Sequence, residues 1–217
     1  MNGVTLESLT EKLELADQLL VGRNTMFEPQ DLPGRYGRAI KAVDRLLQIM
    51  NCPSVLGGGW AVWRHGFTGR ITQDIDIVLP ADRIEEFLRV ASVSGFELLP
   101  QREGRWPKVR HKETDVKVDI LPEGARPGTP ECLAPTTIPH PLQMGAVQGL
   151  LRYISLPRLI ELKLAAGRMR DEYDVVELMR ANLDKIDIIR EHLTSVHADY
   201  VLHFDRLLNR ARNQRDE

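Results

Sequence analysis

Cysteine is scarce in this sequence. Two of the 217 residues are cysteines, Cys52 and Cys132, and neither has another Cys or a His beside it at the spacing of metal ligands. We therefore expect two free thiols in a reducing compartment, without a disulfide and without a zinc site built on cysteine.

An excess of either charge is also absent. Lys and Arg together number 29 against 31 for Asp and Glu, which leaves a formal net charge of −2. A protein whose whole surface binds nucleic acid is usually basic. Any contact with a polyanion must therefore be confined to a local patch.

Long hydrophobic runs are missing as well. Every apolar stretch is interrupted by charge well before it reaches the length of a membrane span. The first eleven residues show neither the basic start nor the apolar segment of a secretion signal. We expect no membrane association and a cytoplasmic location.

What the sequence does contain is the composition of an ordinary globular protein, 42% hydrophobic and 28% charged. Apolar residues recur at helical spacing in two segments, residues 6–20 and 40–50. Strand-like segments then alternate with helical ones, and the clearest strands are residues 54–56, 74–79 and 116–120.

A segment dense in proline and glycine, residues 122–141, follows the last of these strands and predicts a long loop without regular elements. Beyond it the pattern is helical, with helices expected near 156–167 and 171–180 and two more before the end. The sequence therefore predicts an α/β fold, a small mixed β-sheet flanked by helices with a C-terminal helical bundle. We expect N-terminal helices in residues 1–52, a catalytic core in 53–141 and a C-terminal helical region in 142–217.

Three aspartates stand out within the predicted strands. Asp74 and Asp76 are one residue apart, so both side chains project from one face while Ile75 and Ile77 point into the core. Asp119 lies in the same pattern on a later strand. Paired carboxylates repel one another unless a cation lies between them, and three of them can bind one or two Mg²⁺ ions.

A glycine-rich turn precedes these acids. The short apolar segment 54–56 runs directly into Gly57, Gly58 and Gly59, after which residues 60–65 have the pattern of a short helix. Glycines at a strand-to-helix turn allow the backbone to approach a triphosphate closely, and the helix start offers free N–H groups to anionic oxygens.

The stretch LGGGWAVWRHGFTGRITQDIDIVLP resembles the signature of the polymerase-β-like nucleotidyltransferase superfamily. It is most similar to AbiEii-type toxin nucleotidyltransferases and to aminoglycoside and lincosamide nucleotidyltransferases. The Gly-Gly-x-Ala pattern of these families matches residues 58–61, and their Arg-x-Thr-x-Asp-hydrophobic-Asp pattern matches residues 70–76. The third acid of the family maps onto Asp119.

The resemblance implies a metal-dependent transfer of a nucleoside monophosphate from a nucleoside triphosphate, with release of pyrophosphate. It implies Asp74, Asp76 and Asp119 as catalytic residues and as ligands of Mg²⁺ or Mn²⁺. The nucleotide would contact a set of four residues: Gly58, Gly59, Thr72 and Lys163.

The chain departs from the family at one position of the turn. Many members carry Gly-Ser where this chain has Gly58-Gly59, so a serine hydroxyl is missing there. Thr72 is our candidate to replace it in part.

Lys163 belongs to a looser helical match over residues 155–178, which also includes Arg168, Arg170, Asp171 and Asp174. One interpretation is that Lys163 reaches the triphosphate, and its replacement would then weaken nucleotide binding with little loss of stability. The other is a solvated or snorkelling lysine on a helix face. For the neighbouring arginines and aspartates we favour a surface set of ion pairs over phosphate binding.

Three functions stay open on the sequence alone. A toxin-like enzyme that modifies RNA or protein would use the basic segment 102–112 and could have an antitoxin partner, whereas an enzyme acting on a small molecule such as an antibiotic would need an acidic pocket for a cationic acceptor. The third alternative is a non-catalytic nucleotide-binding or interaction module that retains the fold, against which the three acids argue.

Overall fold

The computed structural model describes residues 27–69, 71–101, 104–129 and 132–213. The helix expected in residues 6–20 lies outside this part of the chain, and so does Arg70. The two cysteines are free thiols, as predicted, with Cys52 buried and Cys132 exposed.

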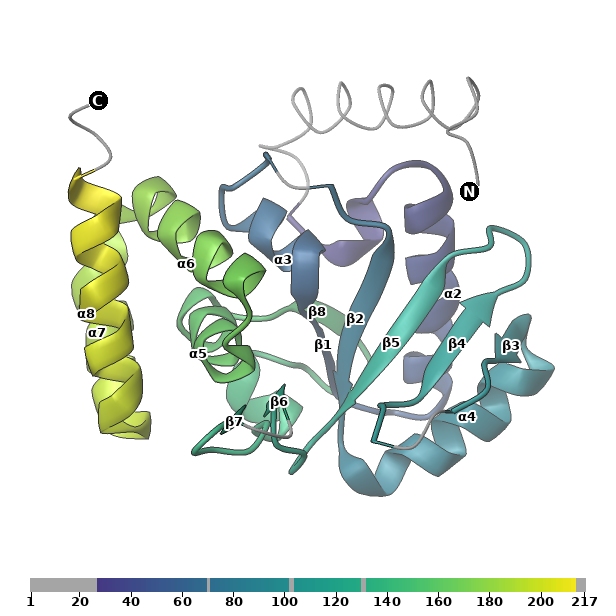
Figure 1. Cartoon of the computed structure of the whole chain (residues 1–217). Helices are drawn as coiled ribbons and strands as arrows, with labels where there is room; N and C mark the ends of the chain where they lie inside the picture. The colour runs from purple at the N-terminus through teal and green to yellow at the C-terminus, as the bar shows by residue number, and fades with distance from the viewer. Residues whose placement is uncertain (1–26, 70, 102–103, 130–131, 214–217) are drawn as a thin grey trace, which may run out of the picture.

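A six-stranded mixed sheet forms the centre of the molecule (Figure 1), with the strand order β3-β4-β5-β2-β1-β8. The pairs β2–β5 and β1–β8 are parallel, and the other three pairs are antiparallel. The strands of this sheet are β1 (Ser54–Leu56), β2 (Asp74–Leu79), β3 (Phe96–Leu98), β4 (Lys108–His111), β5 (Lys117–Pro122) and β8 (Leu151–Tyr153).

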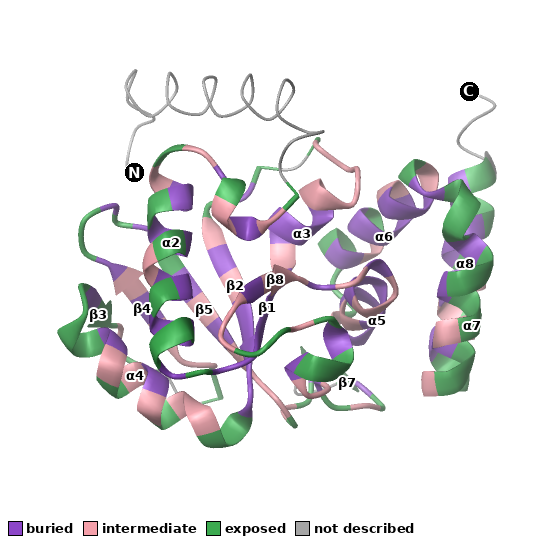
Figure 2. Cartoon of the chain, turned by 180° about the vertical axis from the view of Figure 1, so that it is seen from behind, coloured by how far each residue is buried: buried purple, intermediate pink, exposed green. Residues whose placement is uncertain are grey.

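Alternation of buried and half-buried side chains sets the orientation of β2. Ile75 and Ile77 are fully buried, whereas Asp74 and Asp76 are half-buried on the opposite side of the strand. The isoleucines join the hydrophobic core under helices α2 (Gly34–Ile49) and α4 (Ile84–Val93), which cover one face of the sheet (Figure 2). The aspartates therefore project from the other face.

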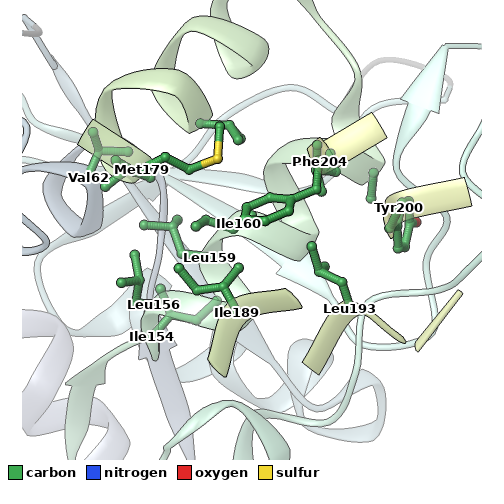
Figure 3. Close-up of a cluster of buried hydrophobic side chains, with 14 of the residues drawn as sticks. Val62, Ile154, Leu156, Leu159, Ile160, Met179, Ile189, Leu193, Tyr200 and Phe204 are labelled. Carbon is green, nitrogen blue, oxygen red and sulfur yellow. The ribbon is translucent and has the colours of Figure 1, made fainter. Parts of the chain in front are cut away.

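The helices expected after the proline-rich segment are present as α5 (Leu156–Ala166), α6 (Met169–Ala181), α7 (Ile186–Val196) and α8 (Ala198–Asn213). They stand together on the side of the molecule away from β3 and β4 (Figure 1). A second core holds them to one another, built around buried side chains such as Ile160, Leu193 and Phe204 (Figure 3).

The prediction for residues 122–141 was wrong in one respect. A small hairpin of β6 (Gly128–Thr129) and β7 (Cys132–Leu133) interrupts the loop. Strands of two residues leave room for the prolines on either side, which explains why proline density did not exclude them. The remaining described elements are the short helix α3 (Gly58–Arg64) and four short 3₁₀ helices: Pro29–Asp31, Ala81–Arg83, Pro141–Met144 and Leu183–Lys185.

Strand β8 was not predicted; it lies in the C-terminal helical region, ahead of the first helix expected there, and it completes the sheet beside β1. Two hydrogen bonds attach the backbone of Leu151 to N-terminal residues. Its N–H donates to the Asp44 carboxylate (2.8 Å), and its carbonyl accepts from the side-chain amide of Gln30. The sheet thus includes strands from both sides of residue 141. Within the described residues, no helix is long and apolar enough to cross a membrane.

Candidate active site

The glycine-rich turn joins β1 to the short helix α3 (Gly58–Arg64) and attaches it to β2. The Gly57 N–H donates to the carbonyl of Asp76 at 2.8 Å. Trp60, buried in the first turn of α3, donates its indole N–H to the carbonyl of Asp74 at 3.0 Å. These two bonds fix the start of α3 against the strand that carries both aspartates. Trp60 also packs on Tyr36, as expected of a packing residue.

Gly58 is required at its position for two reasons. Its φ of +57° lies in the left-handed region, where residues with a side chain are strained. A Cβ atom at this position would also lie only 1.7 Å from Oδ2 of Asp76. The absence of a side chain at residue 58 therefore makes the space that the Asp76 carboxylate occupies.

The three predicted acids lie on neighbouring strands. In the parallel pairing of β2 with β5, Asp76 is the direct partner of Asp119, and Asp74 is the partner of Lys117. Asp119 is half-buried like the other two, between the buried Val118 and Ile120. The structure therefore brings Asp76 and Asp119 side by side, as the resemblance implied.

Asp119 has an asymmetric environment. Its Oδ2 accepts a hydrogen bond from the ammonium of Lys108 on β4, with which it forms an ion pair. Its Oδ1 is buried and has no hydrogen-bond partner among the described residues. A buried carboxylate oxygen without a partner is costly, so this atom is available to a cation or to a donor from a ligand.

Thr72 lies directly beside the glycine turn. A Cβ atom on Gly59 would be 2.4 Å from Oγ1 of Thr72, so the threonine hydroxyl occupies the space where residue 59 would carry a side chain. Thr72 is buried, and its Oγ1 has no hydrogen-bond partner among the described residues. The Thr72 hydroxyl thus occupies the space where the family's serine side chain would begin.

Lys163 does not lie on a solvated helix face, so that interpretation was wrong. Its side chain is only 7% exposed, and its ammonium donates to Asp171 at 2.9 Å and to Asp174 at 2.7 Å. Both aspartates are buried as well. The ion pairs that we expected at the surface are therefore internal, because α6 packs its first two turns against α5 and brings these side chains together.

Arg168 extends this ion-pair network toward the acids of the sheet. Its guanidinium donates to both oxygens of Asp171, at 2.6 and 3.3 Å, while most of the side chain remains exposed. The hydrogen bond with Asp171 raises the pKa of Arg168, and the negative charge of Asp76 contributes to the same shift. Arg168 is thus within electrostatic reach of Asp76.

Asp171 is held in its charged form by the same contacts. Burial alone raises the pKa of a carboxyl group. For Asp171 the hydrogen bond from Arg168 and the charge of Lys163 outweigh burial, so that the pKa lies below its usual value. Lys163 and Arg168 thus share one carboxylate, an arrangement that was not predicted from the sequence.

In the described part of the basic segment, residues 104–112, basic side chains of β4 are already engaged by partners. Lys108 is paired with Asp119, and Arg110 is paired with Glu97 and Asp115. His111 is buried against Thr114. Along β4 the side chains alternate between the two faces of the sheet, which divides a run that looks uniform in the sequence.

The residues present fit a divalent cation, although they do not form a closed site. Within the described part of the chain, no three His, Cys, Asp or Glu side chains are gathered as a metal-binding group. The fit rests on two observations, namely the partnerless Oδ1 of Asp119 and the space above Gly58 that holds the Asp76 carboxylate. Carboxylate oxygens are the ligands that Mg²⁺ and Mn²⁺ prefer.

Comparison with known proteins points to the same part of the chain. Residues 39–126, which include the glycine turn and all three acids, match the family model of aminoglycoside-2''-adenylyltransferase. This match supports membership of the nucleotidyltransferase superfamily. The same match indicates a nucleotidyltransferase enzyme.

Solved structures that match the chain include the crystal structure of ANT(2'')-Ia in complex with adenylyl-2''-tobramycin, at 20% identity over 80% of this chain and 97% of that chain, with a TM-score of 0.43. The solution structure of the antibiotic-resistance factor ANT(2'')-Ia is 18% identical over 82% of this chain and 92% of that chain, with a TM-score of 0.41. JHP933 from Helicobacter pylori is 12% identical over 82% of this chain and 93% of that chain, with a TM-score of 0.36. No curated protein matches the chain.

Proposed function

We propose that this nucleotidyltransferase is metal-dependent and transfers a nucleoside monophosphate to a hydroxyl or amine of a small cationic molecule, with release of pyrophosphate. The observation that carries the proposal is the register of the sheet. Asp76 and Asp119 are direct partners on β2 and β5, and the carboxylate of Asp76 lies over the glycine turn at Gly58.

In this proposal Asp74 and Asp76 hold Mg²⁺ or Mn²⁺. When bound, the cation offsets negative charge on the triphosphate and on the departing pyrophosphate. Asp119 completes the acidic set on the acceptor side, or it accepts the proton of the attacking hydroxyl or amine. Its buried and partnerless Oδ1 supports either role.

The triphosphate would lie along the glycine turn. At Gly58 the space of a side chain is taken by the Asp76 carboxylate, and at Gly59 it is taken by the Thr72 hydroxyl, which has no hydrogen-bond partner among the described residues. Lys163, our fourth predicted nucleotide-binding residue, is bonded to Asp171, which in turn holds Arg168. We therefore propose that Lys163 acts on the nucleotide through Arg168.

Two observations favour a small-molecule acceptor over RNA or protein. The family whose model matches residues 39–126 is named for the adenylylation of aminoglycosides, which are cationic molecules rich in hydroxyl and amino groups. In addition, Lys108 and Arg110 of the basic segment are occupied by carboxylates, and this reduces its value as an RNA-binding edge. A cytoplasmic location and an antitoxin partner remain predictions from the sequence.

The metal-bridged site is tested by calorimetry with a nucleoside triphosphate in the presence of Mg²⁺ and again with a chelator. We expect binding only with the metal, because the acids repel the phosphates without it. Equal affinity in both conditions would reject the metal-bridged arrangement.

The roles of the acids are separated by two substitutions that keep the shape and remove the charge. Asp119→Asn should lower turnover by roughly a hundredfold while Mg²⁺–triphosphate affinity changes little. Asp74→Asn should impair both. Near-normal transfer by Asp119→Asn would make Asp119 a bystander. Asp115 would then be the first acid to consider, although it is exposed and bonded to Arg110.

The acceptor is identified by incubating the protein with triphosphates labelled on the α-phosphate and three sets of acceptors: aminoglycosides, total transfer RNA and a protein extract. We expect the label on an aminoglycoside-like molecule. Label on RNA or on protein would instead support the toxin-like alternative.

A further inference from the structure

Three charged side chains form one row across the sheet, in line with the glycine turn. Lys108 on β4 is the direct partner of Asp119 on β5, and Asp119 is the direct partner of Asp76 on β2. The carbonyl of Asp76 then accepts a hydrogen bond from Gly57 at the end of β1. Directly opposed residues project from the same face of a sheet, so the row brings a cation and two carboxylates together.

The cation of this row is already engaged. The Lys108 ammonium donates to Oδ2 of Asp119, which leaves only Oδ1 of that carboxylate without a partner in the described structure. Lys108 is 43% exposed, whereas Asp119 is 18% exposed. The lysine therefore approaches the carboxylate from the solvent side and has room to move away.

We propose that Lys108 is the internal counter-cation of Asp119, and that it competes with a divalent metal for this carboxylate until a nucleotide enters. The inference rests on the proposed function, in which the three acids form a metal site. Lys108 is then a positioning residue, which controls when Asp119 becomes available.

Electrostatics gives the direction of the effect. An ammonium bonded to Asp119 neutralises part of the negative charge that would attract a divalent cation, so the protein without nucleotide binds metal chiefly through Asp74 and Asp76. The oxygens of an incoming triphosphate can accept hydrogen bonds from the ammonium in place of Asp119. Nucleotide entry thereby frees Asp119, and the acidic set is completed only when there is a substrate to act on.

A purely structural ion pair makes a different prediction. Its loss would change stability without changing the affinity of the nucleotide-free protein for metal. The distinguishing measurement is therefore the binding of Mn²⁺ alone to the full-length protein without nucleotide, by calorimetry and by the electron paramagnetic resonance signal of free Mn²⁺.

The informative variant is Lys108→Met, which keeps the aliphatic stem and removes the charge. We expect its Mn²⁺ affinity without nucleotide to exceed that of the wild type by about tenfold, an order of magnitude set by the loss of one partly screened charge. Lys108→Arg retains the charge and should bind Mn²⁺ like the wild type. With a triphosphate present, the difference between Lys108→Met and the wild type should shrink.

Arg110→Met is the matched control. Arg110 lies two residues further along β4 on the same face and is paired with Glu97 and Asp115 instead of Asp119. Its replacement removes the same charge from the same strand, and Mn²⁺ affinity should stay near that of the wild type.

A double-mutant cycle locates the effect. In the Asp119→Asn background, Lys108→Met should no longer raise Mn²⁺ affinity, because the carboxylate that it frees is absent. The inference is overturned if Lys108→Met binds Mn²⁺ like the wild type, if Arg110→Met raises the affinity equally, or if the effect of Lys108→Met survives in Asp119→Asn. These outcomes are independent of the chelator test, whose failure would reject the metal site itself.

Discussion

The Asp76 carboxylate can take its position only because Gly58 has no side chain. The carboxylate of Asp76 occupies the space of a residue-58 Cβ atom, with Oδ2 only 1.7 Å from that position. The backbone N–H of Gly57 donates a hydrogen bond to the backbone carbonyl of the same aspartate, Asp76, at 2.8 Å. The turn and the acid are thus one structural unit, although they lie on different elements.

This relationship predicts that Gly58→Ala impairs the site beyond ordinary backbone strain. The methyl group would displace the Asp76 carboxylate, so we expect Mg²⁺–triphosphate affinity to fall by at least about tenfold. The measurement is calorimetric titration of the folded variant with Mg²⁺ and a triphosphate.

Gly34→Ala is the control for Gly58→Ala. Gly34 has nearly the same φ, +58°, but a Cβ atom there would meet nothing within 4 Å. Both variants should lose about 1–2 kcal/mol of stability from the left-handed backbone, and only Gly58→Ala should lose affinity. An equal loss of affinity in both variants would show that backbone strain, and not the position of Asp76, explains the effect.

Local patterns were sufficient to predict the elements that carry the site. Ile75 and Ile77 alternate with Asp74 and Asp76, and such a period of two is set by the pleat of a strand rather than by distant contacts. The placement of Asp119 on a strand followed from the same rule. The closeness of Asp76 and Asp119 was an expectation drawn from the resemblance. The register of β2 with β5 makes the two residues direct partners.

Features that depend on long-range contacts were missed. Strand β8 has only three residues, too few to show a period, and the partners of the Leu151 backbone, Gln30 and Asp44, lie more than a hundred residues earlier in the chain. Lys108 was one cation among many in a basic run. Its link to Asp119 could have been found by pairing the two strands as a hairpin and following which side chains share a face.

The burial of Lys163 changes our expectation for its replacement. The sequence suggested little loss of stability, but Lys163→Ala would leave Asp171 and Asp174 buried without their shared ammonium. Breaking a buried ion pair by removing one partner costs about 3–5 kcal/mol. We expect a loss of this size in chemical denaturation, together with weaker triphosphate binding by the protein that remains folded.

A second variant shows whether unpaired charge causes this loss. The double variant Lys163→Leu, Asp174→Leu removes one buried charge of each sign and leaves Asp171 bonded to Arg168. It should be more stable than Lys163→Ala, since replacing both partners avoids an uncompensated charge. If Lys163→Ala is as stable as the wild type, the lysine does not stabilise the fold through these contacts.

His65 predicts how stability depends on pH. Its Nε2 donates to the carbonyl of Ile154 at 2.8 Å, and burial lowers the pKa of the imidazole to about 4 from the 6.5 of an exposed histidine. Between these two pKa values, His65 is protonated in the unfolded chain but stays neutral in the folded protein. The stabilising effect is complete above pH 6.5 and is lost progressively as the pH falls toward 4.

Between pH 7 and pH 5 the wild type should lose about 2 kcal/mol of unfolding free energy because of this histidine. His65→Gln removes the titrating group, so its stability should change less over the same interval. Denaturant unfolding of both proteins at the two pH values gives the comparison. Parallel loss in wild type and variant would assign the pH dependence to other groups.

The arrangement of Gly59 and Thr72 makes the departure from the family's Gly-Ser pattern testable. A side chain on residue 59 would overlap the Thr72 hydroxyl, because its Cβ atom would lie only 2.4 Å from Oγ1. A side chain on residue 59 and a threonine at position 72 therefore cannot both fit without a shift. If Oγ1 of Thr72 serves the triphosphate, Thr72→Val should weaken triphosphate binding by about tenfold, the order expected for one hydrogen bond to a charged group. Stability should change little or rise, because the buried hydroxyl has no partner among the described residues. Gly59→Ser alone should destabilise the protein through the overlap.

Combining Gly59→Ser with Thr72→Ala makes room for the serine and returns a hydroxyl to the turn from the other side. We expect this double variant to regain much of the triphosphate affinity that Thr72→Ala alone loses. Thermal denaturation of the four variants (Thr72→Val, Thr72→Ala, Gly59→Ser and the double variant) separates poor folding from poor binding. Calorimetry with Mg²⁺ and a triphosphate measures the affinity. Normal affinity in Thr72→Val would mean that the threonine only fills space beside Gly59. Failure of the double variant to recover affinity, with a melting temperature near that of Thr72→Ala, would mean that a hydroxyl on residue 59 does not reach the same phosphate oxygen.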